Sequence, residues 1–143
     1  NALNISAWGM TAETMRLDIA AQNIANINTT RTENGGPYRR KMVVFQPIEN
    51  NDFGSVFRSE LMKKNQPQGG VMVSQVVEDQ SDFRSVYNPE HPDADENGYV
   101  QMPNVDLLKE TVDSMAASRA YDANLTAFNT VKTMAIKALE IGK

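Results

Sequence analysis

The residues best suited to do chemistry lie in one acidic stretch, Asp93 to Asn104. Oxygen-bearing side chains stand at its first, third and fifth positions (Asp93, Asp95 and Asn97) and Gly98 stands at the sixth. This is the pattern of an EF-hand calcium loop. The twelfth position should hold a bidentate glutamate but holds Asn104, and prolines interrupt the segment where the entering helix should be. We therefore expect a turn that leads into a short strand.

Other catalytic or metal-binding arrangements find little support. Cysteine is absent, which excludes thiol catalysis, disulfides and thiolate metal sites. The single histidine, His91, is flanked by prolines, and nothing near it resembles a nucleophile elbow. A peptidoglycan hydrolase would need two carboxylates in a cleft, and Glu60, Glu78 and Asp79 form no recognisable framework. We predict a protein that is not an enzyme, with no catalytic residue, cofactor, metal or small-molecule substrate.

Charge and hydropathy exclude further classes. The net charge of −4 argues against nucleic-acid binding, which requires a clustered basic face. The only basic triplet, Arg39 to Lys41, opens a predicted strand, and we expect it to be solvated or to protect a sheet edge. No stretch approaches the roughly 20 apolar residues of a membrane span. The first residues also lack the basic and apolar regions of a cleavable signal, so we expect export, if any, by another route.

Two long amphipathic helices are predicted at the ends of the chain, over residues 3–28 and 105–141. In the first, Ile5, Trp8, Ala12, Met15 and Ile19 recur at steps of three and four residues, the spacing of a coiled-coil stripe. At 1.5 Å per residue the two helices would be about 39 and 55 Å long, whereas a globule of this size spans about 30 Å. We expect such helices to be covered by other chains.

The middle of the chain changes period, which predicts strands at 38–45, 71–77, 83–87 and 98–102 and a long loop at 46–70. Asn104 or Asp106 can cap the second helix, with Glu110 near its positive end. The predicted fold is α+β: the terminal helices pack as a coiled-coil-like pair around a small β-rich middle region. Its segments are a helix at 1–30, the middle region at 31–103 and a helix at 104–143.

Asparagine recurs in both predicted helices although it is a poor helix former. Asn23 and Asn26 lie late in the first helix, and Asn124 and Asn129 lie in the second. These side chains either face solvent or lie within helix–helix seams, where they fix the register.

Three segments resemble the rod, hook and hook-junction proteins of the bacterial flagellum. LDIAAQNIANINTT at 17–30 resembles the N-terminal signature of that class. GGPYRRKMVVF and YNPEHPDADENGYVQMPNVD resemble the members that build the proximal rod. ASRAYDANLTAFNTVKTMAIKAL resembles the terminal helix of the class. The signature positions are Leu17, Asn23, Ile24, Ala25, Asn26, Thr29, Ala120, Tyr121, Asn124 and Lys132 to Met134.

The resemblance implies a structural subunit of the flagellar basal-body rod, which crosses the periplasm as a drive-shaft, exported without cleavage by the flagellar type III apparatus. The implied partners are other proximal- and distal-rod proteins, the base that joins the rod to the membrane ring and export gate, and further copies of the chain in a helical array. A periplasmic binding module with a weak calcium loop stays open as the alternative. We expect the subunit interface to use Trp8, Met15, Ile19, Asn23, Ile24, Asn26, Tyr121, Asn124, Leu125 and Phe128.

Overall fold

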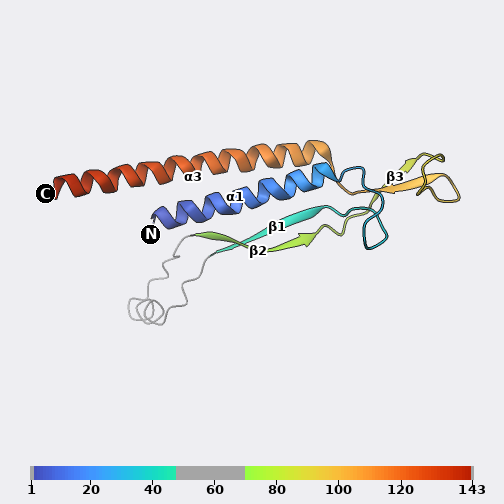
Figure 1. The fold of residues 1–143 in the computed structure, drawn as a ribbon, viewed down its shortest axis with the longest axis horizontal. Helices are drawn as coiled ribbons and strands as arrows, with labels where there is room; N and C mark the ends of the chain where they lie inside the picture. The colour runs from blue at the N-terminus through green and yellow to red at the C-terminus, as the bar shows by residue number, and fades with distance from the viewer. Residues whose placement is uncertain (1, 48–69, 143) are drawn as a thin grey trace, which may run out of the picture.

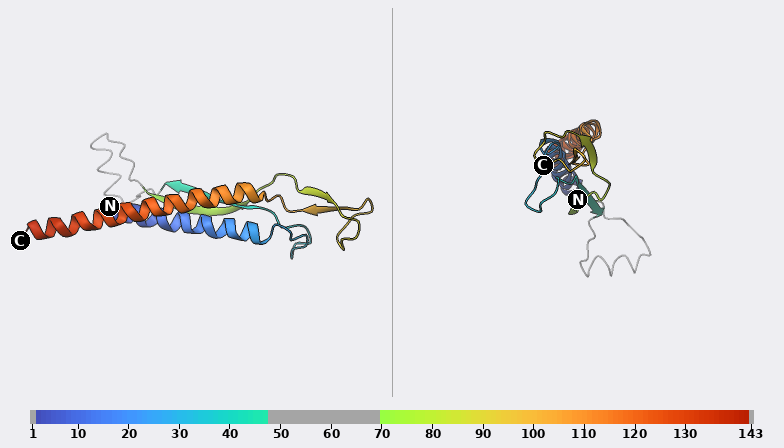
Figure 2. Two further views of the ribbon diagram at one scale, coloured as in Figure 1. Left: turned by 90° about the horizontal axis from the view of Figure 1, so that it is seen from above. Right: turned by 90° about the vertical axis from the view of Figure 1, so that its right-hand side faces the viewer.

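A computed structural model describes residues 2–47 and 70–142, which form an elongated molecule (Figure 1). The described elements are helix α1 (Ala2–Ala25), strands β1 (Lys41–Pro47), β2 (Val71–Glu78), β3 (Arg84–Tyr87) and β4 (Tyr99–Met102), and helix α3 (Leu107–Ile141). The two helices lie side by side, and β1 and β2 run along α1 (Figures 1 and 2). β3 and β4 extend beyond the end of the helix pair where α1 ends and α3 begins. The α+β fold with paired terminal helices and a small β-rich middle region is confirmed.

The helix ends differ from the predicted ones by a few residues. α1 ends at Ala25 rather than at residue 28, because the backbone N–H groups of Ile27 and Thr29 donate to carbonyls only three residues back and the chain turns. Asp106 caps α3 by accepting from the backbone N–H groups of Leu108 and Lys109, so the cap is Asp106 and not Asn104. Neither described helix is long and apolar enough to cross a membrane.

α1 and α3 are antiparallel and packed closely. Gly9 lies against Asn124, since a Cβ atom on Gly9 would be 2.7 Å from Asn124 Oδ1. A second contact lies fourteen residues away along each helix, where Asn23 Nδ2 donates to Glu110 over 3.2 Å. Small buried residues at this seam, such as Ala12 and the fully buried Ala117, leave little space between the helices.

The strands form two antiparallel ribbons. β1 pairs with β2 through a register that shifts between Val44 and Phe45, the irregularity of a β-bulge. β3 pairs with β4, and Gly98 before β4 has a positive φ of 82° that favours glycine. The predicted loop at 46–70 is only partly testable: Gln46 and Pro47 belong to β1, and 48–69 lie outside the described residues. The division at 30 and 103 into three segments stays a prediction.

The close seam predicts a difference between two neighbouring alanines. Ala117→Leu places a large side chain where the native one is fully buried, and overpacking of this kind costs about 1–3 kcal/mol. Ala116 is exposed, so Ala116→Leu should change the free energy of unfolding little. Both variants lose the same small amount of helix propensity, because alanine is the best helix former. Thermal unfolding followed by circular dichroism should therefore show a lower Tm for Ala117→Leu alone, and equal Tm values would contradict the packing described.

Candidate subunit interface

The residues proposed for the interface fall into three classes of exposure. Trp8, Met15 and Leu125 are exposed, at 40%, 40% and 39%. Ile24, Asn26, Tyr121, Asn124 and Phe128 are partly exposed. Ile19 and Asn23 are buried within the chain, at 7% and 1%. In this conformation the first two classes are available to a neighbouring subunit, whereas Ile19 and Asn23 make contacts inside their own chain.

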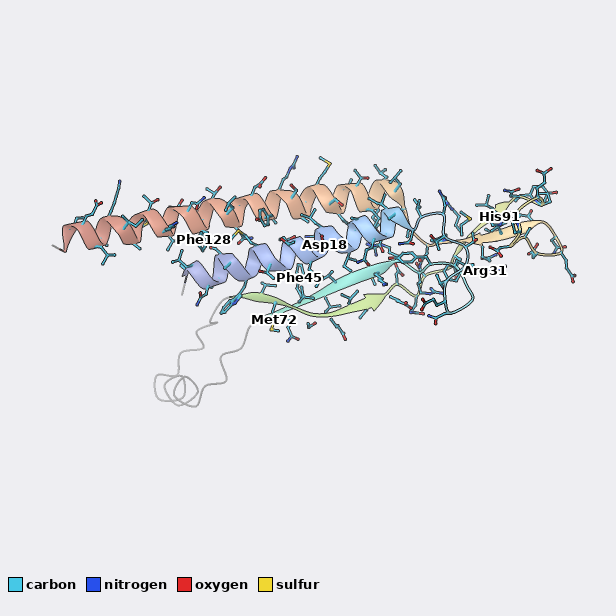
Figure 3. The ribbon with its side chains drawn as sticks, in the orientation of Figure 1. Asp18, Arg31, Phe45, Met72, His91 and Phe128 are labelled. Carbon is cyan, nitrogen blue, oxygen red and sulfur yellow. The ribbon has the colours of Figure 1, made fainter. Side chains whose placement is uncertain are left out.

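The exposed residues of α1 border a groove between α1 and the start of β2. Its apolar lining comes from Trp8 and Met15 on α1, Val71 and Met72 on β2 and Tyr121 on α3. Asp18 also lines the groove; Figure 3 labels it on α1, with Met72 on the neighbouring ribbon. Apolar side chains from three elements around one open groove are more than a scatter of single exposed residues, so this surface is a candidate for contact with another chain.

Asn23 is the centre of a buried polar network at the other end of α1. Its Nδ2 donates to the carbonyl of Lys41 over 2.9 Å and to Glu110 over 3.2 Å. Its Oδ1 accepts from the hydroxyl of Tyr38 over 2.8 Å and from the backbone N–H of Lys41 over 2.9 Å. One side-chain amide therefore fills its hydrogen-bonding capacity and joins α1, the segment before β1, and α3.

Arg40 and Glu110 form the charged part of the same network. Arg40 Nε donates to Glu110 Oε1, and Glu110 is only 2% exposed. The remaining guanidinium nitrogens of Arg40 reach Asp79 and Asp113, each over 3.4 Å. The Arg40–Glu110 pair thus links the start of β1 to the first turn of α3. The carboxylates of Asp79 and Asp113 add two further ion pairs to Arg40.

Asn104 ties the end of β2 to the start of α3. Its Oδ1 accepts from the backbone N–H of Arg40 over 2.7 Å, and its Nδ2 donates to the carbonyl of Asp79 over 3.0 Å. It also donates to Ser81. Among the described residues, no buried side-chain nitrogen or oxygen lacks a hydrogen-bond partner. The network is therefore complete where it is buried.

The network changes the ionisation of its members. Burial, followed by the negative charges of Glu110 and Glu78, raises the pKa of Tyr38. Burial alone would lower the pKa of Arg40, but the hydrogen bond and charge of Glu110, with Asp79 and Asp113, raise it overall. Hydrogen bonds from Ser81, aided by Arg40, lower the pKa of Asp79. Arg40 and Asp79 are thus held in their charged forms and Tyr38 in its neutral form near pH 7.

The acidic stretch that resembled a calcium loop uses its carboxylates within the chain. Asp93 accepts from Thr30 over 2.7 Å and pairs with Arg31. Asp95 accepts from the backbone N–H groups of Asn97 and Tyr99, which forms the turn into β4. The expected turn is confirmed. Among the described residues no group of three or more histidine, cysteine or acidic side chains is placed to hold a metal ion.

The patterns in the sequence do not predict the charged network. The triplet Arg39 to Lys41 was expected to be solvated or to protect a sheet edge, and this is wrong for Arg40, which is 8% exposed and paired with Glu110. Arg39 lies over the ring of Phe83, 4.2 Å from its centroid. Glu110 was expected near the positive end of the helix, where it lies, but its side chain is buried against Arg40. The one signal for the network in the sequence is Arg40 itself, an arginine at the start of an apolar strand.

Two family models match the ends of the chain. Residues 3–31 match the model described as flagella basal body rod protein, and residues 96–141 match the one described as flagellar basal body rod FlgEFG protein C-terminal. Flagellar basal-body rod protein FlgC of Bacillus subtilis strain 168 is 48% identical over 100% of this chain and 97% of that protein. The FlgC proteins of Borreliella burgdorferi and Salmonella typhimurium are each 41% identical, over 99% and 100% of this chain and 95% and 97% of theirs.

The chain belongs to the flagellar basal-body rod protein FlgC family. Its function is that of a structural subunit in the basal-body rod, as the resemblance implied. Asn23 lies in the first matched segment of this FlgC-family chain and Glu110 in the second, while Tyr38 and Arg40 lie between them. The buried network therefore connects the two segments by which the family is recognised.

The charged pair predicts a large effect of a small substitution. Glu110→Gln leaves the buried guanidinium of Arg40 without its nearest carboxylate, and breaking such a pair costs about 3 kcal/mol or more. Glu140→Gln makes the same change at an exposed position of α3 and should cost almost nothing. Urea unfolding of both variants measures the difference. Equal midpoints would show that the buried pair contributes no net stability.

The raised pKa of Tyr38 predicts a stability loss in alkali. Above about pH 10 the unfolded chain loses the proton of Tyr38 while the folded chain keeps it, so the free energy of unfolding falls as pH rises from there. Tyr38→Phe should remove this part of the decline and also cost about 1 kcal/mol at pH 7, since Asn23 Oδ1 loses one partner. Tyr87→Phe, at a position 64% exposed, is the control. Parallel pH profiles for wild type and Tyr38→Phe would refute the assignment.

Proposed function

We propose that the chain assembles into the rod through its two terminal helices, by contacts with neighbouring rod subunits. The observation that carries this proposal is the apolar surface left open on both helices. On α3, Leu108, Met115 and Leu139 are 72%, 53% and 73% exposed, and on α1, Ile5 and Trp8 are 39% and 40% exposed. Exposed apolar residues along a helix in such number are typical of a surface that another chain covers.

The contact is heterologous, so repetition yields a helical array rather than a closed dimer. Trp8, Met15, Leu125 and their partly exposed neighbours take part in it, while Asn23 and Ile19 support it from within the subunit. The partners are other proximal- and distal-rod proteins and the base that joins the rod to the membrane ring and export gate. Many small packing contacts along the helices give the rod the stiffness to transmit torque across the periplasm.

The subunit reaches its place by flagellar type III export without cleavage and performs no catalysis. The matched relatives are rod proteins, which supports a structural role for the whole chain. The carboxylates of the acidic stretch are bonded to Thr30, Arg31 and backbone N–H groups, and this favours the structural role over the calcium-binding alternative.

Assembly through the helices predicts the effect of one charge. Leu125→Asp places a carboxylate in an apolar contact with a neighbouring subunit, where an unpaired charge is strongly disfavoured. A strain carrying only this variant should lack rods and fail to swim, although Leu125 is exposed in the single chain and the β-rich region should stay folded. Leu125→Met keeps the apolar character and volume and should swim. Normal swimming of the Leu125→Asp strain would contradict the proposal.

A further inference from the structure

The last ten residues of α3, 132–141, lie beyond the described part of α1. The contacts of Gly9 with Asn124 and of Asn23 with Glu110 set the register of the two helices, and the same register places Ala2 beside Val131. Residues 132–141 therefore extend past α1, and the C-terminal end of α3 is seen beyond α1 in Figure 1 and in the left view of Figure 2. At 1.5 Å per residue this end is about 15 Å long.

The end of α3 is apolar and uncovered. Met134, Ile136, Leu139 and Ile141 are 65%, 49%, 73% and 84% exposed. A single helical segment that exposes four large apolar side chains gains stability when another surface covers them. Among the described elements α1 is the only one that contacts α3, and its described part ends beside Val131.

The groove between α1 and β2 fits this end in length and character. Its wall on α1 runs from Ala7 to Asp18, about 17 Å of helix. Trp8, Met15 and Met72 border it and are 40%, 40% and 43% exposed. The groove is thus about as long as the free end of α3 and offers the apolar surface that this end lacks.

Charge also matches. The end of α3 carries Lys132 and Lys137 against a single acid, Glu140. Among the described residues that line the groove, Asp18 is the only one with a charged side chain. A helix with two lysines beside an apolar stripe is therefore complementary to an apolar groove with one carboxylate at its edge.

We propose that residues 132–141 of one copy dock in the α1–β2 groove of a second copy. A chain cannot fill its own groove in this way, because its α3 is one continuous helix that leads away from Tyr121, which lines the groove. The contact joins different surfaces of the two copies and so can repeat along an array. This inference rests on the proposed function, and it names the surfaces that self-association uses.

The absence of cysteine from the chain allows a direct test. The double variant Thr11→Cys, Ala138→Cys places one thiol at the groove and one on the free end. Within one chain the register sets Thr11 beside Asp122, so Ala138 is about 24 Å further along the helix, beyond the roughly 7 Å limit of a disulfide. Any disulfide between the two must join two copies.

The variant is expressed as the only copy in a swimming bacterium, and isolated basal bodies are treated with a mild oxidant. We expect disulfide-linked dimers and longer chains of this subunit, at least tenfold above the control Thr11→Cys, Thr111→Cys. Thr111 is exposed near the opposite end of α3. Adding Asp18→Lys should reduce the cross-linking severalfold, and adding Lys137→Glu to that variant should restore it.

The outcomes separate the inference from the proposed function. Basal bodies that contain the variant but show no cross-link above the control would overturn the inference and leave the rod role intact. A cross-link to a different rod protein would overturn the choice of a second copy as occupant. An unmodified chain that is exported but never found in basal bodies would contradict the proposed function, and the inference would fall with it.

Discussion

The structure depends on the need to keep the charge of Arg40 paired where it is almost excluded from water. Glu110 in the first turn of α3 supplies the opposite charge, and Asn23 and Asn104 make further hydrogen bonds around the pair. An unpaired charge at this depth would cost several kcal/mol, so a conformation that separates α1, β1 and α3 is disfavoured as a whole. The apolar core could not enforce this alone, since many of its members are alanine or valine.

A polar network of this kind specifies geometry more than it adds stability, because desolvation of the charges offsets much of their attraction. Asn23 can fill all its hydrogen bonds only when Lys41, Tyr38 and Glu110 occupy the observed positions. The amide therefore selects one register of α1 against α3. The same register brings Gly9 into close contact with Asn124 towards the other end of the two helices.

Local patterns in the sequence predicted most of the fold, and non-local pairing lay beyond them. Hydrophobic period placed both helices and all four described strands within a few residues, because period depends only on neighbours along the chain. Arg40 and Glu110 lie 70 residues apart, and the position of Arg40 at the start of an apolar strand does not say which carboxylate pairs with it. For the same reason the period of the stripe on α1 does not distinguish Ile19, which the fold buries, from Trp8 and Met15, which it leaves exposed. The residues 48–69 lie outside this comparison.

The burial pattern differs between the two ends of the helix pair. At the end of the helix pair that holds the network, polar side chains fix the arrangement of the subunit's own elements. The signature residue Asn23 is buried there and contacts its own chain. Towards the other end α1 is open on the side of the groove, and α3 then extends beyond α1 with no other described element of the chain beside it. A subunit built in this way can hold its helices in one register before it meets a neighbour. In the assembly that we propose, other chains then cover the apolar surface at the open end, so that the long helices serve both folding and assembly.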